Sequence, residues 1–207
     1  EVRQQAPRIG VANAGVSVKE IQDYRAQTPS LDTIVEYHQM SFNLLGRGEA
    51  TRVQTGVVSP EFFDVLGVKP MLGRTFRTDD DSPGAPAVLL VSHSFWKNAL
   101  GGDPGIVGRA FEMNDRVHTV VGVLPPIPQF PAENDVFMPP SACPFRSNPQ
   151  TIANRQGRML TAIGRLRPDA TLDRVQNDLA VVSDRLNHEY PADYDAAHTG
   201  FHAAAVS

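Results

Sequence analysis

The chain of 207 residues carries a formal net charge of −4, and 41% of its residues are hydrophobic and 20% charged. This composition predicts a folded protein and excludes a disordered one, and the lack of a basic surplus or basic stripe argues against a nucleic-acid partner. The single cysteine, Cys143, cannot by itself form an intramolecular disulfide or a zinc cluster. No stretch approaches the roughly 20 apolar residues that span a bilayer, and residues 1–10 do not resemble a signal peptide. The simplest interpretation is a mature or excised soluble piece.

The first third of the chain predicts two helices and a β-hairpin. A capping box at residues 17–20 begins a helix. After a proline, apolar residues at helical spacing predict a second, short helix over residues 31–38. Alternating apolar residues then predict strands at 40–44 and 53–57, which a glycine turn at 46–48 joins into a hairpin.

The next segment is expected to place a strand between two short helices. One helix is predicted over residues 61–66, and the other begins after Ser92, whose side chain can cap it. Between them, the continuous apolar run at 87–91 is typical of a strand that is buried on both faces. Residues 68–86 are expected to be irregular.

A second hairpin and a proline-rich segment follow. Strands at 109–113 and 117–124 are predicted to flank a tight turn at 114–115, because Asn and Asp tolerate the left-handed backbone of such turns. The prolines that come next force an extended path. A short strand is expected at 136–137 and a long loop at 139–156.

The last quarter contains the most regular helix of the chain. It follows a strand at 160–166, Thr171 caps it, and apolar residues form a stripe over 172–186. We expect this stripe to pack on the sheet, with a contact between protomers as the alternative. Pro191 is expected to end the unit, and a last strand is expected at 201–206. Interleaved helices and antiparallel hairpins together predict an α+β fold.

Several motifs in a fixed order carry a resemblance to a known family. They are 58–68 (VSPEFFDVLGV), 70–76 (PMLGRTF), 91–96 (VSHSFW), 101–109 (GGDPGIVGR), 119–125 (TVVGVLP), 163–168 (IGRLRP) and 189–191 (EYP). With these motifs, residues 17–191 resemble the MacB-like periplasmic core domain of MacB/FtsX-type ABC transporter permeases. Among these, the chain looks most like the large permeases of the acidobacterial type.

The resemblance implies one periplasmic core domain over residues 1–207. Its porter-like lobe of mixed strands and helices would comprise residues 1–66 and 157–207, and a smaller α/β lobe would be inserted at 67–156. It also implies an extracytoplasmic location, in which helices outside this chain tether the domain to the inner membrane.

The function that the resemblance implies is mechanical. The domain would transmit conformational change within an ABC-type export permease and contact substrate or partner proteins. A cytoplasmic ATP-binding subunit and a second permease protomer are the expected partners, and an adaptor protein or an extracytoplasmic substrate could join them. Neither catalytic residues nor a cofactor or metal is expected in this domain, and likeness to the family does not name the exported molecule.

Four patterns resemble reactive or ligand-binding motifs without meeting the requirements of those motifs. Ser92, His93 and Ser94 lack the flanking glycines of a nucleophile elbow, so a helix cap is favoured. The acidic run at 79–81 lacks the later glutamate of a calcium-binding EF-hand loop, and the glycine-rich segment at 101–105 lacks the lysine of a phosphate loop. His198 and His202 would share a face of a helix, but the glutamate of a zinc-protease motif is missing.

The proline-rich segment at 125–131 is the candidate for contact with a partner. Phe130 lies near its end, and with Pro128 and Pro131 it would offer a rigid apolar surface. The alternative is a rigid connector in which Phe130 is tucked into the fold. Trp96 is expected in the core.

Two other classes of function remain as alternatives. A free-standing periplasmic ligand-binding module would have a small-molecule pocket between its lobes, a cleavable signal peptide upstream and no membrane span downstream. A hydrolase would require a histidine close to a serine or carboxylate inside a cleft, and no constellation in the sequence supports one.

Overall fold

A computed structural model describes the chain over residues 1–45, 50–113 and 115–207. These residues form two compact units, each with its own hydrophobic core. Unit 1 consists of Glu1–Glu36 and Asn148–Ser207, and unit 2 is the continuous segment Tyr37–Ser147. In sequence, unit 2 is therefore an insertion into unit 1.

The strands and helices of unit 1 come from both of its segments. Its strands are β1 (Val2–Gln5), the beginning of β2 (Leu31–Leu45), β9 (Thr161–Leu166) and β10 (His202–Ala205). Its helices are the 3-10 helix η1 (Pro7–Ile9) and the α-helices α1 (Val18–Gln27), α4 (Pro149–Ala153), α5 (Leu172–Glu189), α6 (Pro191–Tyr194) and α7 (Ala196–Thr199).

The sheet of unit 1 has the strand order β10-β1-β9-β2, and β1 is antiparallel to both of its neighbours. The chain order β1-α1-β2, then β9-α5-β10, gives the β-α-β-β-α-β pattern of a ferredoxin-like unit. Unit 2 occupies the connection between β2 and β9. The fold is therefore a small split sheet into which a second lobe has been inserted.

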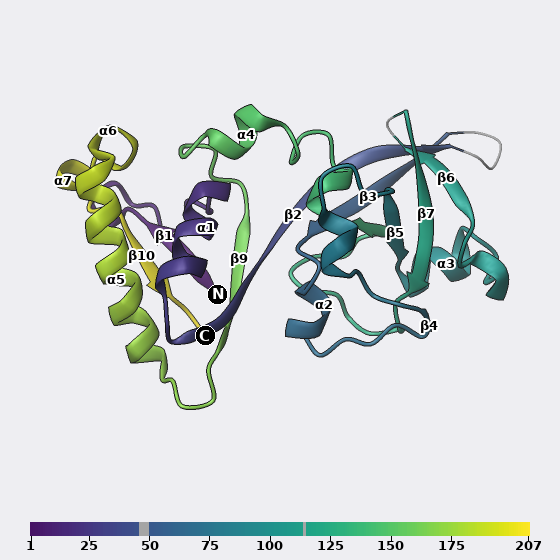
Figure 1. The fold of residues 1–207 in the computed structure, drawn as a ribbon, viewed down its shortest axis with the longest axis horizontal. Helices are drawn as coiled ribbons and strands as arrows, with labels where there is room; N and C mark the ends of the chain where they lie inside the picture. Colours follow the sequence, from purple (N-terminus) through teal and green to yellow (C-terminus); the bar gives the residue numbers. More distant parts are fainter. Residues whose placement is uncertain (46–49, 114) are drawn as a thin grey trace. The chain divides into compact units, whose positions relative to one another are not determined.

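Helix α5 covers one face of this sheet and lies along β10 (Figure 1). Its apolar stripe is buried in the core of unit 1, through Val175, Leu179, Val182 and Leu186. The hydroxyl of Thr171 accepts a hydrogen bond from the backbone N–H of Arg174 at 3.2 Å, which confirms the predicted cap. The prediction that the stripe packs on the sheet is also confirmed, so this face of α5 is already used within its own unit.

The strands and helices of unit 2 follow one another along a single segment. Beyond the second part of β2, its strands are β3 (Thr51–Val58), β4 (Leu72–Gly73), β5 (Val88–Val91), β6 (Ala110–Met113), β7 (Arg116–Val123) and β8 (Val136–Met138). Its helices are α2 (Phe62–Val65), α3 (His93–Asn98) and the 3-10 helices η2 (Thr78–Asp81), η3 (Pro104–Ile106) and η4 (Pro140–Ala142).

Unit 2 contains a mixed sheet with the order β2-β3-β8-β5-β7-β4, and β6 pairs with β2 and β7. The pairs β3–β8 and β5–β7 are parallel, whereas β2–β3, β5–β8 and β6–β7 are antiparallel. The mixed sheet of unit 2, the antiparallel strand pairs of unit 1 and the interleaved helices confirm the predicted α+β fold. Trp96 lies in the core as predicted, and its indole N–H donates to the backbone oxygen of Asp103 at 2.9 Å.

Several element predictions are wrong. Residues 31–38, predicted as a helix, form the first half of the long strand β2. The expected loop at 139–156 contains η4 and α4, and Pro191 begins α6 instead of ending the unit. Proline fits the first turn of a helix because the N–H that it lacks has no partner there.

The boundaries between the two units differ from the expected boundaries of the lobes. The chain passes between units at Glu36–Tyr37 and at Ser147–Asn148, whereas lobe boundaries were expected after residues 66 and 156. The hairpin of β2 and β3 belongs to unit 2 because Phe42, Leu44 and Val53 are buried in its core. The inserted unit is consequently the longer of the two.

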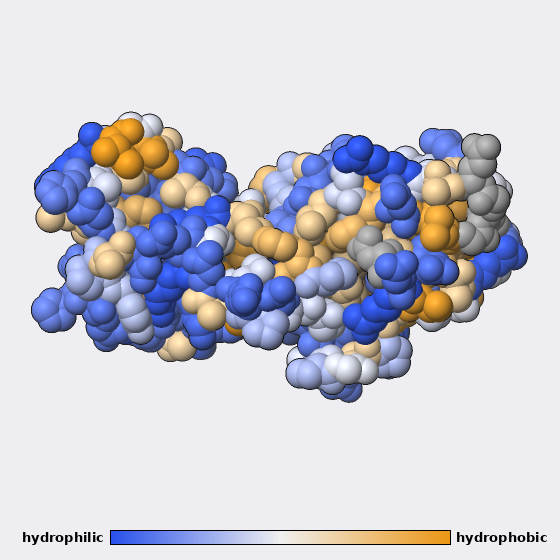
Figure 2. Space-filling view, turned by 90° about the horizontal axis from the view of Figure 1, so that it is seen from above, coloured by the Kyte–Doolittle hydropathy of each residue, from blue (hydrophilic) through white to orange (hydrophobic). Residues whose placement is uncertain are grey.

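The predicted hairpin of β2 and β3 is present, but its turn at 46–48 lies outside the described residues, as does Asn114 of the turn at 114–115. Asp115 has the expected left-handed backbone, with a φ of 57°. In the view of Figure 2, hydrophilic residues cover most of unit 1 apart from one hydrophobic patch near its end, and hydrophobic residues are spread among hydrophilic ones over unit 2. No helix within the described ranges combines the length and apolar character that crossing a bilayer requires.

Candidate functional site

A pocket of about 580 Å³ lies entirely within unit 2. Four parts of the chain line it: α2 and the residues after it, the start of α3, the segment that follows β7, and β8. Its volume is in the range of about 300–1,000 Å³ that is usual for small-molecule sites. We treat this pocket as the candidate functional site.

Three phenylalanine rings form the floor of the pocket. Phe62 and Phe63 are consecutive on α2 and meet edge to face, with ring centroids 5.4 Å apart. Phe63 also meets Phe137 of β8 edge to face at 5.1 Å. All three residues are buried, and edge-to-face contacts are a favourable arrangement of aromatic rings. The floor is therefore a rigid aromatic surface.

The proline-rich segment forms one wall of the pocket. Within it, Ile127 is exposed and Phe130 is 51% exposed. The side chains of Gln129 and Asn134 fasten the segment: Gln129 Nε2 donates to the Asn134 backbone oxygen, and Asn134 N donates to Gln129 Oε1, both at 2.9 Å. Because Asn134 is buried, these bonds fix the base of the wall and leave Phe130 at the surface.

Two of the three residues predicted to contact a partner line the pocket. Phe130 and Pro128 both line it, whereas Pro131 does not. The exposure of Phe130 contradicts the alternative in which this ring is tucked into the fold. Contact with a partner protein remains a prediction.

Ser92, His93 and Ser94 form a polar edge of the pocket. Ser92 Oγ accepts a hydrogen bond from Phe95 N at 3.3 Å, so the predicted cap of α3 is confirmed. The two serine hydroxyls lie 3.3 Å apart, and the His93 ring meets Trp96 edge to face. Within the described part of the chain, no hydrogen bond joins His93 to either serine. This edge therefore lacks the contact between nucleophile and base that acyl transfer requires.

Glu133 is the one acidic residue among the described residues that line the pocket, and no lysine or arginine lies among them. Its Oε1 accepts a hydrogen bond from Gln129 N at 3.1 Å. The carboxylate is exposed to solvent at the rim. The pocket thus combines an apolar interior with hydroxyl groups and a negative charge at its margin.

The sequence did not predict that these residues together form a pocket. Phe62 and Phe63 were expected only as core residues, although adjacent residues of a helix point about 100° apart and cannot both face the same direction. That spacing was the available signal that one ring could face a cavity. Ile127 and Glu133 carried no comparable pattern.

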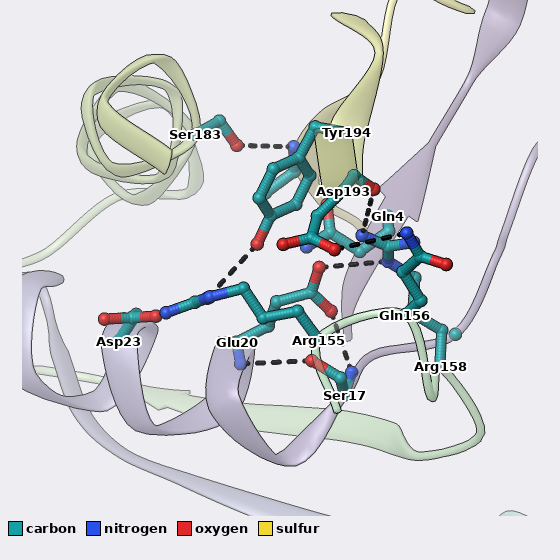
Figure 3. A network of polar contacts seen from close by, with 12 residues as sticks. Gln4, Ser17, Glu20, Asp23, Arg155, Gln156, Arg158, Ser183, Asp193 and Tyr194 are labelled. Atoms are coloured by element: carbon teal, nitrogen blue, oxygen red, sulfur yellow. Dashed lines mark hydrogen bonds and ion pairs between the residues drawn. The ribbon is translucent and has the colours of Figure 1, made fainter. Parts of the chain in front are cut away.

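A network of buried polar groups in unit 1 is the second notable cluster (Figure 3). Glu20 is fully buried, and its Oε1 lies 3.0 Å from Arg158 Nε. Arg155 pairs with Asp23 at 2.8 Å and donates to the Tyr194 hydroxyl at 3.3 Å. Burial is the main cause that raises the pKa of Tyr194, and the nearby Glu20 carboxylate adds to it. These charges are paired with one another, so the network joins α1 to α6 and serves as a structural tie within unit 1.

The acidic run at 79–81 is occupied by contacts within the protein. Asp80 forms two hydrogen bonds with the guanidinium of Arg74, at 2.6 and 2.9 Å, and Asp81 accepts from Ser141 N at 2.7 Å. Burial opposes ionisation of Asp80, but these bonds to Arg74 hold its pKa below the usual value. The run serves to fix η2.

His198 and His202 do not share a helix. His198 lies in α7 with its Nδ1 2.6 Å from Asp195 Oδ1, and His202 begins β10 with its Nδ1 2.8 Å from the backbone oxygen of Gly200. The described residues contain no group of three or more His, Cys, Asp or Glu side chains that could hold a metal ion. In the segment at 101–105, the Asp103 carboxylate accepts from Gly105 N and caps η3.

Comparison with known proteins gives a family and a fold. A family model described as the MacB-like periplasmic core domain matches residues 2–182. A search of curated proteins found no match.

Three solved structures share the fold. A domain of a provisionally named permease from Porphyromonas gingivalis is 18% identical with a TM-score of 0.69, over 98% of this chain and 86% of that one. The extracellular domain of the noncanonic ABC-type transporter YknZ from Gram-positive bacteria is 13% identical with a TM-score of 0.67, over 100% and 98%. The periplasmic region of MacB from Actinobacillus actinomycetemcomitans is 15% identical with a TM-score of 0.64, over 98% and 86%.

Proposed function

Because the chain belongs to the MacB-like periplasmic core domain family, we propose that it is the extracytoplasmic part of an ABC-type export permease that relays conformational change. In this proposal, membrane helices on both sides of the described chain tether it to the inner membrane. A cytoplasmic ATP-binding subunit and a second permease protomer are its partners. An adaptor protein or a substrate binds on the outer side.

The observation that carries this proposal is the pairing of the two ends of the described chain. The backbone nitrogen of Glu1 lies 2.5 Å from the backbone oxygen of Val206, and Val206 N donates to the Glu1 oxygen at 2.9 Å. Next to them, Val2 and Ala205 are partners in the β1–β10 ladder. Two membrane helices attached here would therefore enter unit 1 side by side, and a movement of one against the other would strain this ladder.

The strand directions of unit 1 favour a relay. Val2 pairs with Ala162, the second residue of β9, so β9 begins beside the paired chain ends and runs past them in the direction opposite to β1. At the end of β9, Arg167 N donates to the Ser30 oxygen at 3.0 Å, just before β2 begins. The strand β2 then continues from unit 1 into unit 2. A strain on the β1–β10 ladder would thus be carried through the sheet to the strand that leads into the inserted unit.

The lack of an ATP-binding motif in the sequence also favours a permease domain. The sequence contains no Gly-Lys-Ser/Thr phosphate loop, so the ATP chemistry would belong to a separate subunit. In unit 1, the buried Glu20 pairs with Arg158 and Asp23 pairs with Arg155 in the network of Figure 3. In unit 2, no hydrogen bond among the described residues joins His93 to Ser92 or Ser94, which lie 3.3 Å from each other. We therefore assign this domain no catalytic step.

The location is tested by thiol labelling of the full-length permease. In a Cys143→Ser background, Val181→Cys places a thiol at an exposed position of α5. We expect a membrane-impermeant maleimide to label it in intact spheroplasts as fully as after lysis. Ala162→Cys, at a fully buried position of β9, is the control and should react only after denaturation. Labelling of Val181→Cys that requires lysis would contradict an extracytoplasmic location.

The relay is tested by distance measurements between spin labels on the full-length permease with its ATPase. One pair joins Val181→Cys of unit 1 to Val117→Cys of unit 2, both at exposed positions. A second pair joins Val181→Cys to Ile9→Cys, both within unit 1. ATP followed by vanadate trapping should change the distance distribution of the first pair and leave the second unchanged. Identical distributions for the first pair with and without nucleotide would refute the relay.

A further inference from the structure

We propose that the pocket of unit 2 binds a rigid, mainly apolar small molecule whose polar group is uncharged or positively charged. This inference goes beyond the relay function and does not depend on membrane tethering. It rests on three properties of the pocket: its pre-formed shape, its exposed apolar surface and the sign of the charge at its rim.

The shape is built into the fold. The floor rings of Phe62, Phe63 and Phe137 are locked by edge-to-face contacts, and the bonds between Gln129 and Asn134 fix the base of the proline-rich wall. Successive prolines restrict the backbone of that wall further. A cavity of about 580 Å³ with such walls suits a rigid ligand, because neither partner loses much conformational freedom on binding.

Exposed apolar surface is concentrated at the mouth of this pocket. Phe130 is 51% exposed, and Ile127 beside it is also exposed. Single exposed hydrophobic residues need no explanation, but these two border a cavity whose floor is aromatic. A ligand that enters the cavity removes both side chains from water and packs against the aromatic floor. This arrangement favours an aromatic or polycyclic molecule over a flexible polar one.

The charge at the rim selects against anions. Glu133 lines the pocket, Gln129 N donates to one of its oxygens, and no hydrogen bond from the described residues reaches the other oxygen. No lysine or arginine lies among the described lining residues, so a bound anion would meet a carboxylate without a compensating cation. The hydroxyls of Ser92 and Ser94 can serve an uncharged polar group.

Two fluorescent probes with the same anilinonaphthalene skeleton test the proposal. N-phenyl-1-naphthylamine is uncharged, and 1-anilinonaphthalene-8-sulfonate adds one sulfonate. Titrated into the purified chain at pH 8, the uncharged probe should bind saturably with one site per chain. The sulfonate should bind at least about tenfold more weakly, because it faces Glu133.

Matched variants locate the site. Phe130→Ala should weaken binding of the uncharged probe at least about fivefold, as expected for an aromatic contact. Phe145→Ala removes a phenylalanine of unit 2 that is 40% exposed and does not line the pocket, so binding should not change. Glu133→Gln should reduce the difference in affinity between the two probes. Glu112 is exposed on β6 and does not line the pocket, so Glu112→Gln should leave that difference unchanged. Circular dichroism and the unfolding midpoint show that each variant is folded.

Several outcomes would overturn the proposal. One such outcome is that the sulfonate binds the wild-type chain as tightly as the uncharged probe does, and another is that neither probe binds saturably. Equal effects of Phe130→Ala and Phe145→Ala would place the probe elsewhere. Analytical sedimentation tests whether a second copy of the chain occupies the pocket instead. A dimer that dissociates in the Phe130→Ala variant would show that it does. None of these results bears on the relay, which the spin-label distances test separately.

Discussion

Arg158 lies against a carboxylate that solvent does not reach: its Nε is 3.0 Å from Oε1 of Glu20, whose side chain is 0% exposed (Figure 3). The second oxygen of Glu20 accepts a hydrogen bond from Ser17 N at 2.8 Å, which completes the predicted capping box of α1. The Arg158 guanidinium also stacks on the ring of Phe201, 4.4 Å from its centroid. One side chain therefore ties the start of α1 to the segment before β10.

Removing Arg158 should destabilise the fold strongly. In Arg158→Met the Glu20 carboxylate stays buried without its cation, and breaking one partner of a buried pair costs about 3–5 kcal/mol. We expect a loss of this size in the free energy of unfolding, measured by urea denaturation. Adding Glu20→Gln to Arg158→Met should recover part of the loss, because glutamine keeps the capping bond and removes the buried charge.

The matched control is the pair of Arg165 and Asp32, 2.7 Å apart with both side chains nearly half exposed. Arg165→Met should cost less than about 1 kcal/mol, since water screens an exposed pair. Equal costs for Arg158→Met and Arg165→Met would show that the buried pair contributes nothing beyond a surface one.

Gly73 should not tolerate a side chain. Its φ is +69°, and a Cβ at this position would lie 2.1 Å from the backbone oxygen of Val121, on the strand that pairs with β4. Backbone atoms cannot move aside cheaply, so Gly73→Ala should displace β4 from β7 and cost at least about 3 kcal/mol. Gly73 lies within the motif at 70–76, and this contact gives a physical reason for a glycine there.

Gly67 is the control that separates the steric clash of an added Cβ from the strain of a left-handed backbone. Its φ is +70°, but a Cβ there meets no atom within 4 Å. Gly67→Ala should therefore cost only the strain of a left-handed alanine, about 1–2 kcal/mol. Thermal unfolding of the two variants measures both effects. A Gly73→Ala variant as stable as Gly67→Ala would mean that β4 moves freely.

The long strand β2 shows where sequence patterns fail. Leu31, Ile34 and Tyr37 have helical spacing, which favoured a helix at 31–38. However, Thr33, Ile34 and Val35 are successive β-branched residues, which lose side-chain freedom in a helix and suit a strand. Residues 34–38 are all buried, so the strand also lacks the alternation that would reveal it. Propensity was here the better guide than spacing.

Elements with a local cause were predicted well. The caps of α1, α3 and α5 depend on side chains within three residues of the helix start, and all three are present. The pocket depends on segments that are remote in sequence, 62–68, 92–94 and 124–137, and no local pattern states that they meet. Phe130 and Pro128 were found because prolines mark a rigid exposed segment, whereas Glu133 has no such marker.

Acid should destabilise unit 2 through His38. Burial is the main cause that lowers the pKa of His38 from 6.5 to about 4, with the Arg146 charge adding to it. Neither ring nitrogen of His38 has a hydrogen-bond partner among the described residues. The folded-state pKa is below the unfolded one, so the full stability is present above about pH 6.5. It is lost as the pH falls toward 4, by up to about 3 kcal/mol.

Urea denaturation between pH 7.5 and 4.5 measures this loss. His38→Gln should flatten the pH dependence, although His118, whose pKa is also lowered mainly by burial, leaves a smaller slope. His198→Gln serves as the control, because solvent screens the exposed pair of His198 and Asp195, so its loss should change the slope little. If His38→Gln and His198→Gln retain the wild-type slope alike, the buried ring is not its source.

Cys143 should be unreactive in the folded chain. It is fully buried, its Sγ lies 3.6 Å from Met40 Sδ, and burial raises the pKa of the thiol although Arg146 N donates to it at 3.4 Å. Because reaction needs both exposure and the thiolate, a disulfide reagent at pH 8 should reach it only after opening of the core. Its rate should be at least about a hundredfold below that of Ser94→Cys in a Cys143→Ser background, since core opening costs several kcal/mol. In urea the Cys143 rate should rise along the unfolding curve, whereas a fast rate in buffer would show that this part of the core opens readily.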